Sequence, residues 1–167
     1  YGKDQARNIL PYLIRPPKWL ILGGPASGNE AQFVCSRYPS LSVLGIEPNH
    51  ESVKWQKTIG RWPERAVILE AALAARPNDL VEIVFEQDSF ESASADPAKR
   101  EGNRNNQSAK FSMVSTVTLD GLDNVYGPFE DAVVWMDIEG YEYQALLGGM
   151  DLIRSGRVQL WNVEMLS

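Results

Sequence analysis

The chain has 167 residues, of which 44% are hydrophobic and 23% charged, a composition typical of one globular domain. With 16 Lys and Arg against 22 Asp and Glu, its net charge of −6 repels phosphate backbones and argues against a general nucleic-acid binder. One cysteine and one histidine exclude a disulfide framework within the chain and a multi-cysteine or histidine-rich metal site, and no apolar run is long enough to span a membrane.

Residues 1–17 form a lead-in of mixed character that ends at Pro16-Pro17, because proline cannot continue a helix. Residues 18–167 are predicted to form one domain in which apolar runs alternate with helical periodicity. The apolar runs predict strands at 19–22, 41–47, 66–69, 81–85, 115–118, 132–136 and 158–166. Helices are predicted at 29–38, from a cap at Asn49 to about residue 59, at 120–126, and at 143–150 with an interruption at Gly148-Gly149.

The segment 87–110 differs from the rest of the chain. It is dense in Ser, Asn, Asp, Glu, Lys and Arg and nearly free of large apolar side chains, which predicts a mobile polar loop at the surface. A solvated loop is the plainer interpretation, and a lid over a site is the alternative.

Strands that alternate with helices predict an α/β fold, a mostly parallel sheet with helices on both faces. Ligands of such sheets bind at the carboxyl ends of the strands. The residues at these ends are therefore the candidates for function: the turn 23–28, Glu47, Glu70, Asp137 and Glu164.

The glycine-rich turn at 23–28 follows the first strand and opens a helix, so that its backbone can approach a ligand closely. No Lys-Ser or Lys-Thr pair follows it, which argues against a nucleoside triphosphate loop. The Gly-x-Gly-x-x-Gly fingerprint is also absent, which disfavours a nicotinamide-dependent oxidoreductase. A simple tight turn is the alternative to a ligand-binding one.

Glu47 ends the second strand, 19 positions after Gly28. An acid at this place can accept hydrogen bonds from both ribose hydroxyls of a nucleoside-containing cofactor, and an exposed strand-end carboxylate is the alternative. His50 is expected on the exposed first turn of a helix rather than in a catalytic role.

Asp137 and Glu139 follow the strand at 132–136, two positions apart, so both carboxylates can face the cleft while Gly140 permits a sharp reversal into the next helix. Helix capping is the alternative role. As facing carboxylates they are the candidates for a general base. Such a pair could also recruit a divalent ion, but no metal site is predicted.

Five blocks occur in a fixed order along the chain: Ile46-Glu47-Pro48-Asn49, Val117-Thr118-Leu119-Asp120, Met136-Asp137-Ile138-Glu139-Gly140-Tyr141-Glu142, Leu147-Gly148-Gly149 and Val163-Glu164. Together they resemble the FkbM-type family of S-adenosylmethionine-dependent methyltransferases over about residues 19–164. The Asp-x-Glu-Gly-Tyr-Glu block is the most specific part. The resemblance implies a Rossmann-like class I methyltransferase fold that methylates a hydroxyl on a small metabolite or sugar.

The resemblance also implies a site for S-adenosylmethionine, carried over by motif match. The implied contacts are Gly24 and Gly28 at the methionine end with Ala26 in the same turn, Glu47 on the ribose, Glu70 and Ala71 near adenine, and Asp137 beside the methionine moiety or the acceptor. The candidate catalytic residues remain Asp137 and Glu139.

The chain departs from the family pattern at the first strand. Leu22 stands where members usually carry Asp, and Gly24-Pro25-Ala26 stands where they carry a Gly-Ala-Asn turn. The missing Asp removes an anchor near the amino group of the cofactor. A catalytically degenerate domain of the same fold, used for binding or as a scaffold, is therefore the alternative function.

The expected partner is a small-molecule acceptor with a hydroxyl, with neither nucleic acid nor a membrane span, and a cytoplasmic location is expected. Class I methyltransferases commonly end in an antiparallel hairpin, which we expect to be absent because the chain stops at Ser167. The strand at 158–166 would then be an apolar edge that pairs with a second copy or with the rest of a larger chain.

Overall fold

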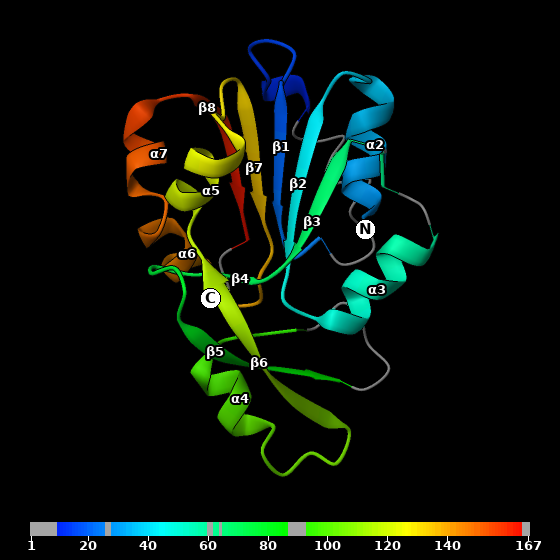
Figure 1. The fold of residues 1–167 in the computed structure, drawn as a ribbon, viewed down its shortest axis with the longest axis vertical. Coiled ribbons are helices and arrows are strands. Elements are labelled where there is room, and N and C mark those ends of the chain that lie inside the picture. The colour runs from blue at the N-terminus through cyan, green and yellow to red at the C-terminus, as the bar shows by residue number, and fades with distance from the viewer. Residues whose placement is uncertain (1–9, 26–27, 60–61, 64, 87–92, 165–167) are drawn as a thin grey trace.

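A computed structural model describes residues 10–25, 28–59, 62–63, 65–86 and 93–164 of the chain. Its centre is a five-stranded sheet, all parallel, in the order β3-β2-β1-β7-β8 (Figure 1). The strands are β1 (Trp19–Gly23), β2 (Ser42–Glu47), β3 (Ala66–Glu70), β7 (Ala132–Met136) and β8 (Val158–Val163). This architecture confirms the predicted α/β fold, and each of these strands overlaps a predicted apolar run.

Successive side chains of a strand point to opposite faces of the sheet. Because consecutive residues of β1 are apolar, both faces of the sheet are apolar there. Leu20 and Leu22 of β1 share a buried cluster with Val34 of α2 (Asn29–Arg37). Ile21, between them, belongs to the cluster on the opposite face, which also contains side chains of α5 (Leu119–Tyr126), α6 (Glu142–Leu147) and α7 (Met150–Ser155). Helices therefore cover both faces, as predicted.

Two helix boundaries follow from local chemistry that the sequence reveals. Asn49 accepts a hydrogen bond on Oδ1 from the backbone N–H of Glu51 at 3.0 Å, which caps α3 (His50–Ile59). Gly148 and Gly149 separate α6 from α7, and a Cβ at Gly148 would lie 2.0 Å from the backbone oxygen of Ala74. The interruption thus lets this corner approach the chain that follows β4 (Ala72–Leu73).

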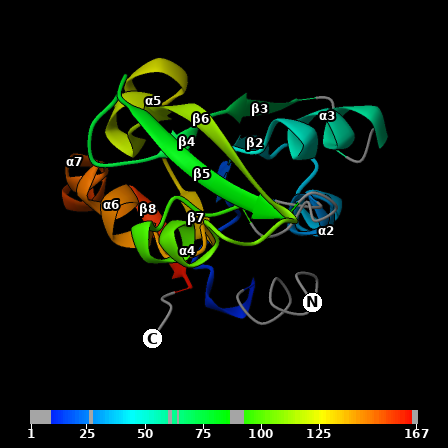
Figure 2. The same ribbon diagram turned by 90° about the horizontal axis from the view of Figure 1, so that it is seen from below.

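A second, smaller sheet departs from the predicted pattern. It has the order β4-β6-β5, and β5 (Leu80–Glu86) runs antiparallel to β6 (Ala109–Val117). The sequence correctly predicts strands at both places but treats them as members of one alternating α/β sheet, which is wrong. The small sheet lies beyond the carboxyl ends of the main strands (Figures 1 and 2).

The prediction of a continuous polar loop at 87–110 is wrong for much of its length. Residues 87–92 lie outside the described residues, but α4 (Pro97–Gly102) and the start of β6 fall inside the predicted loop. The helix begins with Asp96, whose side chain accepts a hydrogen bond from the N–H of Ala98 at 3.0 Å, followed by proline in the first turn. The segment is polar because α4 lies away from the main sheet (Figure 1) and its side chains are exposed or half-buried.

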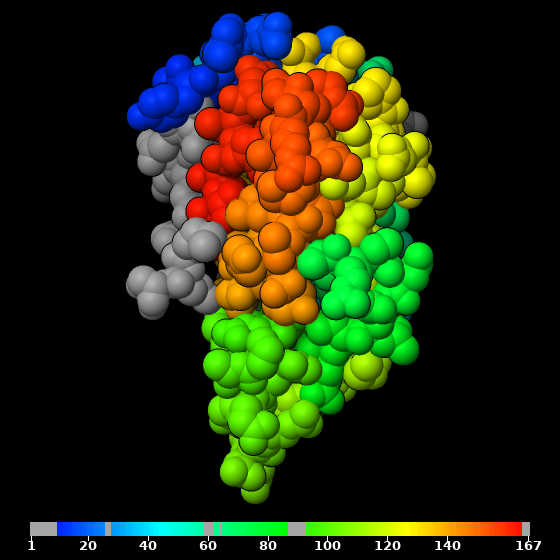
Figure 3. Space-filling model, turned by 90° about the vertical axis from the view of Figure 1, so that its left-hand side faces the viewer, coloured from blue at the N-terminus to red at the C-terminus, as the bar shows by residue number. Residues whose placement is uncertain are grey.

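The lead-in and the last strand lie next to each other. The backbone N–H groups of Ile14 and Arg15 donate to Oε1 of Gln159 at 3.2 and 3.3 Å, which holds the lead-in beside the start of β8. In the described part of the chain, β8 pairs with β7 alone. Figure 3 shows β8 at the molecular surface beside α6 and α7. No helix in the described ranges is long and apolar enough to cross a membrane.

Candidate functional site

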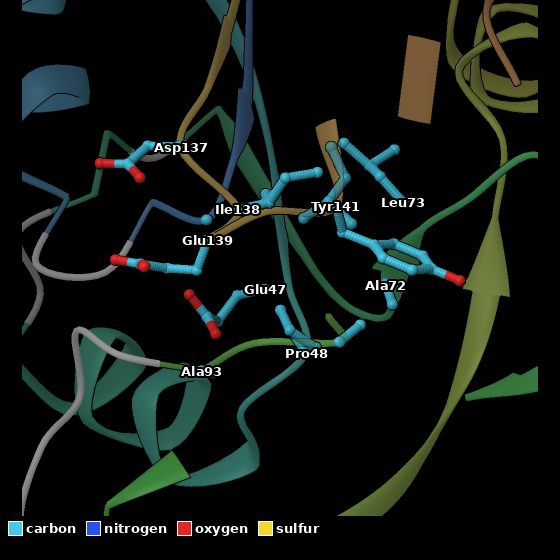
Figure 4. A pocket seen from close by; sticks show the side chains of 12 residues that line it. Glu47, Pro48, Ala72, Leu73, Ala93, Asp137, Ile138, Glu139 and Tyr141 are labelled. Atoms are coloured by element: carbon cyan, nitrogen blue, oxygen red, sulfur yellow. The ribbon is translucent and has the colours of Figure 1, made fainter. Parts of the chain in front are cut away.

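A pocket opens where the carboxyl ends of β1, β2 and β7 meet the small sheet (Figure 4). Its empty volume, including the part open to solvent, is about 480 Å³. This is the place where the strand-end rule predicts a ligand. The residues that line it are Gly24, Ile46, Glu47, Pro48, Ala72, Leu73, Ala93, Ala95, Asp137, Ile138, Glu139 and Tyr141.

The predicted site residues divide into two groups. The first group lines the pocket: Gly24, Glu47, Asp137 and Glu139. Gly28, Glu70 and Ala71 are not among the lining residues, and Ala26 lies outside the described residues. The strand ends thus bring three of the predicted carboxylates together in the pocket, whereas the strand-end candidates Glu70 and Glu164 are not among its lining residues.

Gly24 is essential to the packing of this site. Its φ of +68° favours glycine, and a Cβ there would lie 2.0 Å from the backbone oxygen of Asp137. Its N–H donates to the backbone oxygen of Ile46 at 3.0 Å. The turn after β1 is therefore in direct contact with the chain after β7 and with β2.

Gly28 lies beside the ring of Trp62. A Cβ at Gly28 would lie 2.7 Å from Nε1 of Trp62, so the indole fills the space beside this glycine. Trp62 also lies against Gly45 of β2, where a Cβ would meet the ring at 2.7 Å. No signal in the sequence pointed to Trp62 as the partner of two glycines.

Glu47 is a buried carboxylate at the end of β2, with 3% of its surface exposed. Its Oε1 accepts a hydrogen bond from the backbone N–H of Asn49 at 2.9 Å. The alternative of an exposed strand-end carboxylate is therefore wrong. Burial of an ionisable side chain is costly unless it is hydrogen-bonded, so this carboxylate is held at the pocket wall.

The turn after β7 is closed by Glu142, which is buried. Its Oε1 accepts hydrogen bonds from the backbone N–H groups of Ile138 at 3.0 Å and Gly140 at 3.2 Å. Glu142 thus fixes the backbone that carries Asp137 and Glu139.

Asp137 lies in an environment that favours its protonated form. Burial, the largest cause, raises the pKa of Asp137 to about 6, and the negative charges of Glu164 and Glu139 add to the effect. A hydrogen bond with the side chain of Glu164, at the end of β8, acts in the same direction. A carboxylate with a pKa near neutrality is suited to accept a proton.

Glu139 is held by the segment that the sequence interpreted as a loop. Lys99 of α4 forms an ion pair with Oε2 of Glu139, and the hydroxyl of Ser94 donates to the backbone oxygen of Glu139 at 2.6 Å. Ala93 and Ala95 of the same segment line the pocket. The described part of this segment therefore contacts the site, and nothing in the sequence indicated that Ser94 and Lys99 lie beside it.

Glu70 contacts His50 and does not line the pocket. Its Oε2 lies 2.8 Å from Nδ1 of His50, and both side chains are largely exposed. Ala71 is buried and donates its backbone N–H to the backbone oxygen of Glu47 at 3.2 Å. The next two residues, Ala72 and Leu73, line the pocket.

The pocket has an acidic side and an apolar side. Figure 4 shows the carboxylates of Glu47, Asp137 and Glu139 extending to one side, with Leu73 and the ring of Tyr141 on the other. None of the twelve lining residues is a Lys, Arg or His. Such a site can accept a ligand with a positive charge, hydroxyl donors and an apolar ring.

Comparison with known proteins agrees with this geometry. The family model described as the methyltransferase FkbM domain matches residues 24–167. The chain belongs to the FkbM methyltransferase family. This membership confirms the resemblance found in the sequence, and it supports methyl transfer as the class of activity. A search of curated proteins found no match.

In this FkbM domain, the most specific sequence block coincides with the turn that carries Asp137 and Glu139. Across the described residues there is no group of three or more His, Cys, Asp or Glu side chains arranged to hold a metal ion.

Proposed function

We propose that this FkbM-family chain is an S-adenosylmethionine-dependent methyltransferase that methylates a hydroxyl of a small molecule. The observation that supports the proposal best is the convergence of three carboxylates and an apolar wall in one pocket. Two of these carboxylates, those of Asp137 and Glu139, belong to the most specific block of the family resemblance.

The residues present fit this cofactor by their chemistry. S-adenosylmethionine has a ribose diol, a cationic sulfonium and an apolar adenine ring, and when bound it supplies an electrophilic methyl group. We assign the buried Glu47 to the ribose hydroxyls, because hydrogen bonds to a charged acceptor contribute about 1.5–3 kcal/mol each. Asp137 and Glu139 attract the positive charge, and the wall with Ala72 and Leu73 takes the adenine.

Of the two candidate bases, Asp137 suits the role better. The pKa of Asp137, raised to about 6 by burial, leaves it ionised at neutral pH yet more basic than an exposed aspartate. The carboxylate of Glu139 is already engaged in an ion pair with Lys99. We therefore assign removal of the acceptor hydroxyl proton to an oxygen of Asp137.

A binding or scaffold domain without catalysis is the second candidate, and one observation favours it. Leu22, which stands where family members usually carry Asp, is 2% exposed and packs in the core cluster that includes α2. The end of β1 thus offers the cofactor no carboxylate. In this candidate the fold would hold a ligand without transferring a methyl group.

Calorimetry with S-adenosylmethionine and with its demethylated product, S-adenosylhomocysteine, tests the proposal. We expect both to bind, and we expect label from methyl-labelled S-adenosylmethionine to enter a small-molecule acceptor pool. Absence of binding at millimolar ligand contradicts the proposed function. Binding without any methyl incorporation favours the scaffold candidate.

A further inference from the structure

One cation touches the acidic side of the pocket from outside it. Lys99 of α4 pairs with Oε2 of Glu139, and the two side chains are 36% and 32% exposed. Lys99 is not among the residues that line the pocket. It lines a neighbouring hollow together with Ser94 and Asn103, and Glu139 lies on the boundary between the two.

The backbone of Glu139 shows that its position is imposed by its surroundings. Its φ of +58° lies in the left-handed region, which is unfavourable for a residue other than glycine. The hydrogen bond from Ser94 to the backbone oxygen of Glu139 and the bond from the N–H of Gly140 to Glu142 hold this conformation. Strain that neighbouring contacts maintain is typical of functional sites.

Charge is the property that this pair controls. S-adenosylmethionine and S-adenosylhomocysteine share the adenosine and amino-acid groups and differ by one methyl group and by the positive charge on sulfur. A carboxylate without a partner attracts the charged sulfonium and not the neutral thioether. A carboxylate that is paired with a lysine discriminates less between them, because the two charges of the pair oppose each other.

We propose that Lys99 is a positioning residue that holds Glu139 and offsets its charge, and so limits the preference of the pocket for the cationic methyl donor over the neutral product. This inference rests on the proposed function. A limited preference serves catalysis, because tight binding of the ground-state cation does not accelerate the chemical step.

The test is the ratio of the two dissociation constants, measured by calorimetry in low-salt buffer because salt screens exposed pairs. In Lys99→Met we expect the preference for S-adenosylmethionine over S-adenosylhomocysteine to rise about fivefold or more, since Glu139 then lacks its partner. Lys99→Arg should restore the wild-type ratio to within about twofold, since it keeps the charge. Lys110→Met is the matched control, an exposed lysine on β6, and should leave the ratio unchanged.

A double-mutant cycle keeps the test independent of stability. Glu139→Gln should lower the preference for the cationic ligand, and Lys99→Met added to it should shift the ratio less than it does in the wild-type background, because only the direct charge effect of Lys99 is left. A turn that merely loosened would weaken both ligands equally and leave the ratio as in the wild type. A ratio in Lys99→Met within about twofold of wild type, or an equal shift in the Glu139→Gln background, overturns the inference.

The binding data distinguish failure of the proposed function from failure of the role of Lys99. If neither ligand binds the wild-type chain, the proposed function is contradicted. If both ligands bind and the ratio of their dissociation constants is unchanged in Lys99→Met, only the positioning role is contradicted.

Discussion

Glu47 combines almost complete burial with a single carboxylate oxygen that accepts the backbone N–H of Asn49. Its neighbours in the pocket include the apolar Ile46 and Pro48. A strand-end carboxylate that faces a pocket can accept hydrogen bonds from the ribose hydroxyls of a nucleoside. The role proposed for Glu47 therefore follows from its position at the pocket wall as much as from the family pattern.

Glu47→Ala is expected to weaken the binding of S-adenosylhomocysteine at least about tenfold, because hydrogen bonds to a charged group are lost. Calorimetry measures the change. Glu101→Ala, an exposed glutamate on α4, serves as the control and should bind as the wild type does. Unchanged affinity in Glu47→Ala would remove Glu47 from the ribose role.

Asp137 should make stability depend on pH in a defined direction. The pKa of Asp137 is raised from 3.8 to about 6 by burial and by neighbouring carboxylates, so the folded state holds a proton that the unfolded state releases. Stability contributed by the protonated form is therefore lost as pH rises from about 4 to about 6, and the loss persists above that range.

Asp137→Asn removes this penalty, so its melting temperature relative to wild type should be higher at pH 7.5 than at pH 4.5. Thermal melts at both values measure the difference. Asp79→Asn, at an exposed aspartate directly before β5, is the control and should show no such trend. A difference that is the same at both pH values would contradict the buried, proton-binding environment of Asp137.

At the scale of elements, the corner between α6 and α7 is packed against the chain after β4. A Cβ at Gly148 would lie 2.0 Å from the oxygen of Ala74 and 3.2 Å from the side chain of Thr118. Backbone contact this close leaves no room for a side chain, so the glycines here serve packing as well as helix termination.

Gly148→Ala is expected to lower the free energy of unfolding by about 1–3 kcal/mol, the usual cost of forcing an extra carbon into a packed region. Gly102→Ala is its control, because nothing lies within 4 Å of the added carbon there. Denaturant unfolding compares the two variants. Equal stability of Gly148→Ala and wild type would contradict this close contact, because the backbone near Ala74 could then move away from residue 148 at no cost in free energy.

The elements differ in how well the sequence predicts them. Runs such as 132–136 are apolar on both faces and identify the buried parallel strands, and the strand-end rule then finds Glu47, Asp137 and Glu139. The small sheet was misassigned because periodicity indicates a strand but not its partner. Helix α4 was missed because its polar composition matches that of a loop, although Asp96-Pro97 is a start signal for a helix.

The remainder of the site depends on contacts between distant segments. Lys99 reaches Glu139 across 40 positions of sequence, and Ser94 reaches the same residue across 45. A local sequence pattern cannot predict contacts between residues this far apart in the chain. The same reason explains why Ala72 and Leu73, rather than Glu70 and Ala71, form the pocket wall.

At the scale of the whole molecule, the main sheet and the small sheet meet at the pocket. Tyr141 packs against the cluster of Ile83, Ala95 and Val114 and also lines the pocket. The small sheet thus forms one wall of the site, while the ends of the main strands supply the carboxylates. Neither unit alone would enclose a ligand.

Strand β8 remains the predicted site of self-association. It lies at the end of the described strand order, and its side chains are all half-buried. A strand with one unpaired side tends to pair with another strand. We expect sedimentation velocity to show a dimer that grows with protein concentration, and a clean monomer at high concentration would contradict this expectation.

A crystal structure with S-adenosylhomocysteine tests the central claim most directly. The account predicts ribose hydroxyls on the carboxylate of Glu47, adenine against Ala72 and Leu73, and the sulfur near Asp137 and Glu139. A ligand bound away from the carboxyl ends of β1, β2 and β7, or a pocket that stays empty at saturating ligand, would contradict it.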